Sequence, residues 1–467
     1  MDESRREFLK TGAKAAATIA AVQPLKALGA QAKIIGANDR VRVAIIGLRG
    51  RGLSHIQAYG AMPNVEIAAL CDIDNNVMRQ RLPDAEKFGS HPKTYVDVRK
   101  VLEDKSIDAV SIATPNHWHS LIGIWACQAG KDVYVEKPCS HNLWEGGQLV
   151  RAAEKYNRVV QHGTQSRSTP DVMEAIKKVR DGVIGEVYLS RGLCYKRRDT
   201  IGHTPVSPVP AGVDYNIWTG PAPLLPFTKN HFHYNWHWFW NYGNGDLGNQ
   251  GVHQIDVARW GLGLGYPDKI SAIGGHFMFD DDQQTPNTLN CAFEYNRPGK
   301  KPVMLEFEVR HWDTNHEAGI GMSHKTKGAV AEKASNGLGP QEGSFNTIGN
   351  IFYGSNGYLA IDSAGGYESW LGKEREPGPS ASASKATNFQ NFIDCVVSRK
   401  KEDLNAPIEE GNLSVSLIHL ANASYRLGRT LHFDPQTRQV IQDDEANRLL
   451  RDGDRGYRAP FVVPEQV

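Results

Sequence analysis

A glycine-rich turn near the N-terminus constrains the fold more than any other feature of the sequence. The apolar stretch 41–46 reads as a strand, and Gly47, Gly50 and Gly52 follow it directly. A helix-compatible segment and a second apolar strand come next, and an acid, Asp72, ends that strand about 20 residues after the last glycine, the usual spacing. Glycines let the backbone approach a pyrophosphate, a helix start holds the anion, and the acid binds ribose hydroxyls. The pattern therefore predicts a dinucleotide site, with an ordinary tight turn as the alternative.

The acid also predicts which dinucleotide binds. A carboxylate at Asp72 would repel the 2′-phosphate of NADP, so NAD is favoured and NADP is the less favoured cofactor. Arg49 occupies the middle of the glycine motif, where a second glycine is usual. If its guanidinium reached the 2′-phosphate of NADP, the preference for NAD would be weaker. Arg49 therefore belongs to the predicted cofactor-binding residues.

Apolar strands continue to alternate with helical segments up to about residue 160. This alternation predicts a parallel sheet covered on both faces, with ligands beyond the carboxyl ends of its strands. Two motifs follow such strand ends, "ATPNHWH" at 113–119 and "EKP" at 136–138. Lys137 would place a cation where a developing alkoxide needs stabilising, although most lysines at strand ends are only surface residues.

Together the motifs resemble the glucose-fructose oxidoreductase and inositol dehydrogenase family (Gfo/Idh/MocA). The resemblance rests on "AIIGLRGRG", "CDID", "SIATPNHWH", "YVEKP" and "GNQGVHQIDVARW", in that order, and is firm to about Gly265. It implies that Lys137 is catalytic and that Pro138 follows a cis peptide bond. The further cofactor-binding residues that the resemblance implies are Thr114, Asn116, His117 and Glu136, besides Lys137 itself.

Beyond residue 161 short strands follow one another without regular helices between them. They predict a largely antiparallel sheet, so the fold class is α/β, a Rossmann domain followed by an α+β domain with a large open sheet. We predict a Rossmann domain at 38–160, a substrate and oligomerisation domain at 161–434 and a tail at 435–467. Residues 373–386 are the best linker candidate, and helical spacing follows them. The resemblance also implies a homo-oligomer joined through the open sheet.

The second catalytic candidate is His253, ahead of the helix-like "QIDVARW". A lone histidine is ordinarily satisfied by local backbone, but the family shows Asp, three residues, then a His that acts as acid and base. Asn249 stands at the Asp position here, and it can hydrogen-bond a hydroxyl but cannot take a proton. Asp256 is predicted to be structural.

An aromatic segment at 231–242 supplies the candidate substrate residues. One interpretation is a hydrophobic strand, and another is a metal site, although the histidine spacings match no familiar ligand pattern. We favour a carbohydrate-binding wall, because flat rings cover sugar C–H faces while His and Asn bind hydroxyls. Its predicted members are Trp236, His237 and Trp238, together with Asn249 and His253, and we expect no bound metal.

These predictions converge on a sugar oxidoreductase that uses NAD(P) to oxidise a secondary hydroxyl of a sugar or glycoside. The first alternative keeps the fold but is redox-neutral: a glycoside hydrolase that oxidises the sugar transiently and then reduces it again. A non-enzymatic binding protein is the second alternative. It is disfavoured because both Lys137 and His253 are present.

The N-terminal segment predicts export. Residues 4–10, "SRREFLK", resemble the twin-arginine consensus, a small-residue cleavage site precedes Lys33, and the apolar run 13–22 is too short to span a bilayer. We therefore expect a signal peptide at 1–32, the twin-arginine machinery as a partner and a periplasmic location. Because that pathway carries folded protein and free NAD is scarce outside the cytoplasm, we expect a tightly held cofactor.

The charge balance argues against other partners. The chain carries 53 Lys and Arg against 52 Asp and Glu. With no excess of positive charge, nucleic acid and anionic membranes are not expected partners. The six cysteines form no CxxC pair, and we predict that Cys71 and Cys127 are buried thiols.

Overall fold

The computed structural model describes residues 40–312, 315, 317–320, 346–363, 366–451 and 455–467. The predicted twin-arginine signal at 1–32 lies outside these residues. Within them, every helix is too short or too polar to cross a membrane. All six cysteines are described, and each is a buried free thiol, as predicted for Cys71 and Cys127.

The first sheet is parallel, and its strand order is β3-β2-β1-β4-β5-β6. Its central strands are apolar and buried, because helices cover both of its faces. The chain runs outward from β1 to β3 and then returns to place β4 on the other side of β1, which creates the crevice where α/β sheets bind ligands. Its elements are β1 (Val41–Ile46), α2 (Gly50–Gly60), β2 (Val65–Cys71), α3 (Asn75–Glu86), β3 (Lys93–Tyr95), α4 (Val98–Glu103), β4 (Ala109–Ile112), α5 (Asn116–Gln128), β5 (Asp132–Val135), α6 (Leu143–Lys155) and β6 (Val160–His162).

The second sheet confirms the predicted fold class. Among the described residues it has ten strands in the order β14-β13-β12-β11-β7-β10-β9-β8-β15-β16. It is mixed, because β7 and β10 pair in parallel while the other paired strands run antiparallel. Its strands are β7 (Val187–Tyr195), β8 (Lys269–Gly275), β9 (Thr288–Tyr295), β10 (Val303–Arg310), β11 (Thr347–Gly354), β12 (Gly357–Asp362), β13 (Gly366–Leu371), β14 (Glu376–Pro377), β15 (Leu431–Asp434) and β16 (Gln439–Val440).

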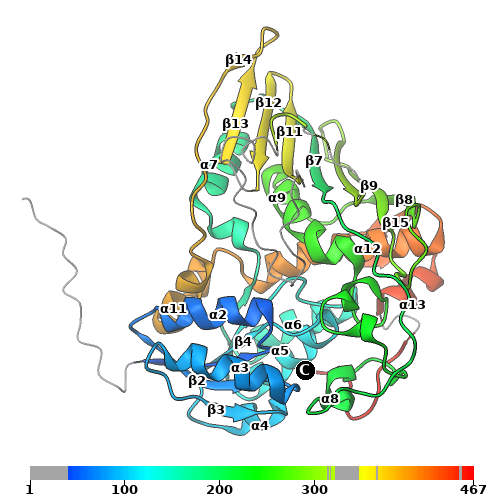
Figure 1. Ribbon diagram of the computed structural model, residues 1–467. Helices are drawn as coiled ribbons and strands as arrows, with labels where there is room; N and C mark the ends of the chain where they lie inside the picture. The colour runs from blue at the N-terminus through cyan, green and yellow to red at the C-terminus, as the bar shows by residue number, and fades with distance from the viewer. Residues whose placement is uncertain (1–39, 313–314, 316, 321–345, 364–365, 452–454) are drawn as a thin grey trace, which may run out of the picture. The chain divides into compact units, whose positions relative to one another are not determined.

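Helices cover one face of this sheet (Figure 1). α9 (Val252–Leu262) packs on β7 and β11, and α12 (Ile408–Leu427) packs on β8. The alternating burial along β9 and β10 follows from this one-sided cover. α7 (Pro170–Arg180), which η2 (Gln165–Ser168) precedes, contacts α9 and the β12 and β13 strands.

The segment between β7 and α9 is irregular. It contains α8 (Tyr215–Thr219), η3 (Lys229–His231), η4 (Asn235–Trp238) and the π-helical turn η5 (Leu247–Gly251). The interpretation of the aromatic stretch as a hydrophobic strand is therefore wrong. Its rings pack among themselves in a separate small core, and this packing, rather than sheet pairing, sets the backbone.

The last part of the chain returns to the first sheet. α11 (Asn388–Ser398), where a helix was predicted, lies beside α2 in Figure 1, and η6 (Lys401–Asp403) follows it. Phe392 and Ile393 of α11 are buried in the same core as β1 and β2. The stretch 435–467, expected to be a tail, contains β16 and α13 (Asp444–Arg451). The predicted second helix corresponds to α12.

Candidate active site

The glycine turn is built so closely that side chains would not fit. Gly47 has φ +85°, and a Cβ there would lie 2.7 Å from the Ala113 carbonyl oxygen. A Cβ on Gly52 would lie 2.0 Å from the carbonyl oxygen of Gly47. Gly50, exposed between them, begins α2, whose first turn has neither a capping side chain nor an acidic residue. The helix start is thus free to hold an anion, and these residues fit the pyrophosphate of a dinucleotide.

Asp72 directly follows β2, where the ribose is expected. Its carboxylate accepts hydrogen bonds from the backbone N–H groups of Leu48 (2.7 Å) and Asp74 (2.9 Å). Burial raises the pKa of Asp72 to about 6, although these two bonds and the charge of Arg49 act in the opposite direction. Arg49 itself is exposed at the N-cap of α2.

The Glu136 carboxylate is buried and contacts other side chains of the first domain. Its carboxylate accepts a hydrogen bond from Arg51 Nε (2.6 Å) and lies 3.1 Å from His55 Nε2, and Ser111 holds the other nitrogen of that ring. Burial would raise the pKa of Glu136, but the charge of Arg51 and the bond to His55 hold it below its usual range. Sequence reasoning missed Arg51. Its Nη2 is buried without a partner among the described residues, and its place in the glycine motif was the available signal.

Lys137 contacts the segment that leads into α9 from its place at the end of β5. The peptide bond between Lys137 and Pro138 is cis, as the family resemblance implied. Lys137 Nζ donates a 2.5 Å hydrogen bond to the backbone carbonyl of Asn249, in η5. Burial lowers the pKa of Lys137, while the negative charge of Glu136 opposes that shift. The ammonium therefore sits at the meeting point of the first sheet's carboxyl edge and the turn that leads into α9.

His253 lies in the first turn of α9, four residues after Asn249. Burial lowers its pKa to about 3, and the charge of Lys137 acts in the same direction. The ring is therefore neutral at physiological pH. Its side chain is half-buried and makes no hydrogen bond to any residue that the structure describes, so a nitrogen is available to accept a proton.

Asn249 is part of a buried polar network. Its amide donates to Asp246 Oδ1 (3.1 Å) and to the Tyr234 hydroxyl oxygen (3.2 Å). Asp246, only 2% exposed, also pairs with Arg198 through two bonds of 3.0 Å and with His311. Burial would raise the pKa of Asp246, but Arg198 and His311 hold it well below its usual range. A carboxylate is therefore present three residues before Asn249, but it is already neutralised.

Tyr234 is the other residue that the sequence did not single out. Its oxygen accepts hydrogen bonds from Asn249 and from Arg198 Nη1 (3.3 Å), so its own proton points away from both. Burial would raise its pKa, yet the charges of Arg198 and Lys196 outweigh burial and lower it. Arg198 and Lys196 follow the end of β7, too far from Tyr234 along the chain for a local motif to reveal the contact.

The cofactor-binding residues that the resemblance implied at 114–117 differ in placement. Thr114 is partly exposed, whereas Asn116 is buried at the start of α5 and donates to Asn244 Oδ1 (3.2 Å). His117 is 1% exposed, its Nε2 lies 3.0 Å from the Trp218 carbonyl, and its ring packs against Trp218 and Tyr242. We therefore assign His117 to the packing of the aromatic core, in place of the predicted cofactor contact.

The aromatic wall needs a similar correction. Trp238 is 2% exposed and Trp236 is 9% exposed, so both are core residues. His237 is half-buried and stacks on Trp236 with ring centroids 3.6 Å apart. Its pKa is lowered to about 3 by burial, with Lys137 acting in the same direction, so it too is neutral. Trp236 therefore supports His237, and the three predicted residues do not form one exposed surface.

Asp256 fulfils its predicted structural role. It is buried, accepts two hydrogen bonds of 2.9 Å from Arg167, and accepts a third from Ser414 (2.6 Å). This pair anchors α9 against η2 and α12, and so fixes the helix that carries His253.

Solved structures show the same fold. A levoglucosan dehydrogenase in complex with NADH superposes with a TM-score of 0.61 at 17% identity, covering 84% of this chain and 99% of that one. GenD2 from gentamicin A biosynthesis, in complex with NAD, gives 0.59 at 18% identity over 85% and 97%.

Sequence relatives match over shorter stretches. A levoglucosan dehydrogenase of Pseudarthrobacter phenanthrenivorans is 30% identical over 230 residues, which is 48% of this chain and 52% of the relative. A glycosyl hydrolase family 109 protein of Shewanella pealeana is 30% identical over 207 residues, 40% of this chain and 45% of the relative. The match spans about half the length of these relatives.

Two models of one oxidoreductase family match the two halves of the chain. The model described as an NAD-binding Rossmann fold matches residues 41–164. The model described as a C-terminal alpha/beta domain matches 174–290 and 379–461. The first match covers all six strands of the parallel sheet, and the second covers β7, β8, β15 and β16 of the mixed sheet. The glycine turn also has the close packing that an NAD-binding fold requires. The chain therefore belongs to the NAD-binding Gfo/Idh/MocA oxidoreductase family.

Proposed function

We propose that this protein is an NAD-dependent oxidoreductase that acts on a secondary hydroxyl of a sugar or glycoside. The observation that carries the proposal is the 2.5 Å bond between Lys137 and the Asn249 carbonyl, because it brings the lysine to the segment that supports His253. The relative named levoglucosan dehydrogenase supports a carbohydrate substrate. NAD is preferred to NADP because Asp72 occupies the ribose end.

In the proposed reaction each side chain has one task. His253, neutral and without a competing partner among the described residues, accepts the proton of the substrate hydroxyl. Lys137 donates a hydrogen bond to the same oxygen and stabilises its negative charge. NAD, which the glycine turn and Asp72 would hold, would supply the acceptor for the hydride that leaves the carbon. The half-buried His237 and the Tyr234 hydroxyl contribute hydrogen bonds that orient the remaining hydroxyls of the sugar.

A redox-neutral glycoside hydrolase is the second candidate, because several relatives carry the name glycosyl hydrolase family 109. In that chemistry the first oxidation is the same, and elimination of the aglycone, addition of water to the resulting double bond and re-reduction follow. Asn249 favours neither outcome, since its amide can hold a hydroxyl but cannot carry a proton.

Product analysis on aryl glycosides separates the two candidates. Oxidation alone yields a keto-sugar in proportion to the NADH formed. Redox-neutral hydrolysis releases the aglycone and leaves total NADH unchanged. If a broad panel of sugars and glycosides gave neither product with NAD-loaded protein, the proposed activity would be wrong.

We further propose that the protein is exported by the twin-arginine pathway to the periplasm, with NAD already bound, and works as a homo-oligomer. The motif at residues 4–10 supports export, and the family resemblance supports assembly through the open sheet. Mass spectrometry of protein purified from the periplasm tests the retained cofactor, and light scattering tests the assembly. Protein recovered without nucleotide, or a monomer at micromolar concentration, would contradict the respective part.

A further inference from the structure

A short stretch of the second domain binds the first domain at the end of β2. After β7 the chain leaves the mixed sheet, and residues 211–214, which we call the strap, run antiparallel to residues 73–75. Two backbone hydrogen bonds of 2.9 Å join the two stretches, and the Asn76 amide donates a third, of 3.1 Å, to the Ala211 carbonyl. The strap therefore lies against the loop that carries Asp72, the acid expected at the ribose.

A histidine further along the same segment contacts this loop through its side chain. His233 Nε2 lies 3.4 Å from Asp74 Oδ2, and the His233 side chain is 25% exposed. Burial lowers the pKa of His233 to about 4, the charge of Arg49 acts in the same direction, and Asp74 opposes both. The ring is therefore neutral at physiological pH, and the contact is one between a carboxylate and a polar nitrogen.

Apolar packing holds the same loop. Ile73, between the two acids, packs against the aromatic core of the second domain. That core includes Tyr215 and Trp218 of α8, the helix that directly follows the strap. The loop after β2 is thus fixed by the second domain through backbone bonds, a side-chain contact and an apolar contact.

The position of the Asp72 carboxylate depends on this loop. The Asp74 N–H donates a 2.9 Å hydrogen bond to Asp72 Oδ1, and the Leu48 N–H of the glycine turn donates one of 2.7 Å to Oδ2. Each carboxylate oxygen keeps a further lone pair that a ribose hydroxyl can use. Because Asp74 is held by the strap and by His233, these two contacts also hold the carboxylate in place.

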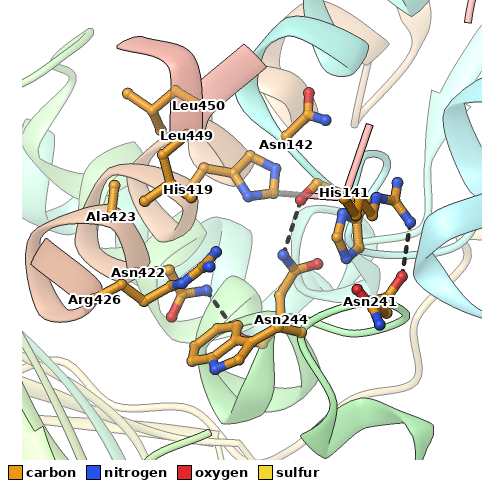
Figure 2. A pocket seen from close by; sticks show the side chains of 12 residues that line it. His141, Asn142, Asn241, Asn244, His419, Asn422, Ala423, Arg426, Leu449 and Leu450 are labelled. Atoms are coloured by element: carbon orange, nitrogen blue, oxygen red, sulfur yellow. Dashed lines mark hydrogen bonds between the residues drawn. The ribbon is translucent and has the colours of Figure 1, made fainter. Parts of the chain in front are cut away.

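The segment that contains the strap is anchored on both sides of it. Before the strap, the Thr204 N–H donates a 2.9 Å hydrogen bond to Asp282, in the β8–β9 connection. After it, the Asn244 amide donates to the His141 carbonyl (3.0 Å), and Asn422 donates to the Asn244 carbonyl (3.1 Å) (Figure 2). The strap is therefore presented to the first domain by a segment whose ends are already fixed.

The sequence of the strap and its approach restricts the backbone. Pro205, Pro208 and Pro210 precede it, and each proline ring fixes φ near −65°. Gly212 has φ +84°, which a residue with a side chain rarely adopts. A stiff approach loses little conformational entropy when the strap binds the loop.

We propose that the strap and His233 retain NAD in its site, by holding the loop that carries Asp72 so that the dinucleotide leaves only after these contacts break. This inference rests on the proposed function, whose tightly held cofactor it explains by named residues. Neither the strap nor His233 takes part in the reaction, so both act by positioning Asp72.

The test measures the dissociation of the nucleotide with no sugar present. Protein loaded with NADH is mixed with excess NAD, and the change in NADH fluorescence gives the dissociation rate. Gly212→Ala should raise this rate about tenfold, because alanine is disfavoured at a positive φ by about that factor and release of the strap relieves the strain. Gly89→Ala is the matched control, since Gly89 has φ +75° in the first domain, and neither added Cβ would approach a described atom closer than 3.5 Å.

Stability separates retention from general damage. Gly212→Ala and Gly89→Ala carry the same kind of strain, so both should lose the same free energy of unfolding in urea, and only the dissociation rate should differ. His233→Ala should raise the rate several-fold, since it removes a contact to a buried carboxylate. His233→Gln keeps a polar group at this position and should stay closer to the wild type.

Equal dissociation rates for the wild type, Gly212→Ala and His233→Ala would overturn the proposal. So would equal acceleration by Gly89→Ala, or release of NADH from the wild type within seconds. If the variants release NADH faster but a panel of sugars is not oxidised, the proposed sugar activity fails and the role of the strap stands. Sugar oxidation with unchanged dissociation rates has the opposite meaning.

Discussion

Lys137 Nζ donates a 2.5 Å hydrogen bond to the backbone carbonyl of Asn249, which connects the carboxyl edge of the first sheet to the turn that begins α9. A backbone carbonyl remains an acceptor whatever side chain stands at that position. The substitution of the family's usual acid by Asn249 therefore leaves the lysine anchored. In the proposed reaction the proton of the substrate hydroxyl passes to His253, because the Asn249 amide cannot carry it.

Replacing Lys137 tests its role directly. Lys137→Met is expected to lower kcat by about 100- to 1,000-fold, because the developing negative charge on the substrate oxygen loses its stabilising cation. Bound nucleotide, measured by mass spectrometry, should persist. Lys105→Met, at an exposed position on the first domain, should leave kcat unchanged. Full turnover of Lys137→Met would contradict the assignment.

The pH dependence of kcat/KM should show no titration of His253 between pH 5 and 8. With a pKa of about 3, the ring stays in its neutral, proton-accepting form at all higher pH values. Protonation of His253 should therefore cause no loss of kcat/KM between pH 5 and 8, whereas His253→Asn should lower kcat about 100-fold or more across this range. An acidic limb near pH 6.5 that disappeared in His253→Asn would show that the ring titrates normally.

Cofactor affinity should have its own pH dependence through Asp72. Its pKa is raised to about 6, so the carboxylate that would accept the ribose hydroxyls is lost as pH falls through that value. We expect the Kd for NAD, measured by fluorescence quenching, to rise below pH 6. Asp72→Asn should bind NAD more weakly at pH 8 and show a flat profile. If the Kd of Asp72→Asn changed with pH as that of the wild type does, a group other than Asp72 would be responsible for the titration.

The buried ion pair of Asp246 and Arg198 should contribute to the free energy of unfolding. Asp246→Asn leaves Arg198 with its charge unbalanced in a buried site, and this should lower the free energy of unfolding in urea by about 3–5 kcal/mol. Asp181→Asn, which breaks the exposed pair with Lys177, should change it by about 1 kcal/mol or less. Equal effects of the two variants would mean that the buried network adds nothing beyond an exposed pair.

Local patterns were sufficient to predict the first sheet and the glycine turn, because each is encoded within a few neighbouring residues, whereas the cis bond before Pro138 was implied by the family resemblance. Helix spacing likewise indicated α11 and α12. The interpretation failed where rings from distant segments decide the structure. His117 is buried because Trp218 and Tyr242, about a hundred residues later, pack over it. The partners of Asp246 lie on two other strand ends, so no spacing rule could indicate that this acid is neutralised.

The return of α11 to the first sheet also means that the first domain is completed late in synthesis. Phe392 and Ile393 fill the core beside β1 and β2, and Asn388 hydrogen-bonds the Tyr134 hydroxyl (2.7 Å), so the first domain is incomplete without them. A ribosome that has released only the first 164 residues has made all six strands of the first sheet, with α2 and α3 on this face, but has not yet made α11, which completes the same core. The core of the first domain is therefore completed only after roughly four-fifths of the chain has been synthesised.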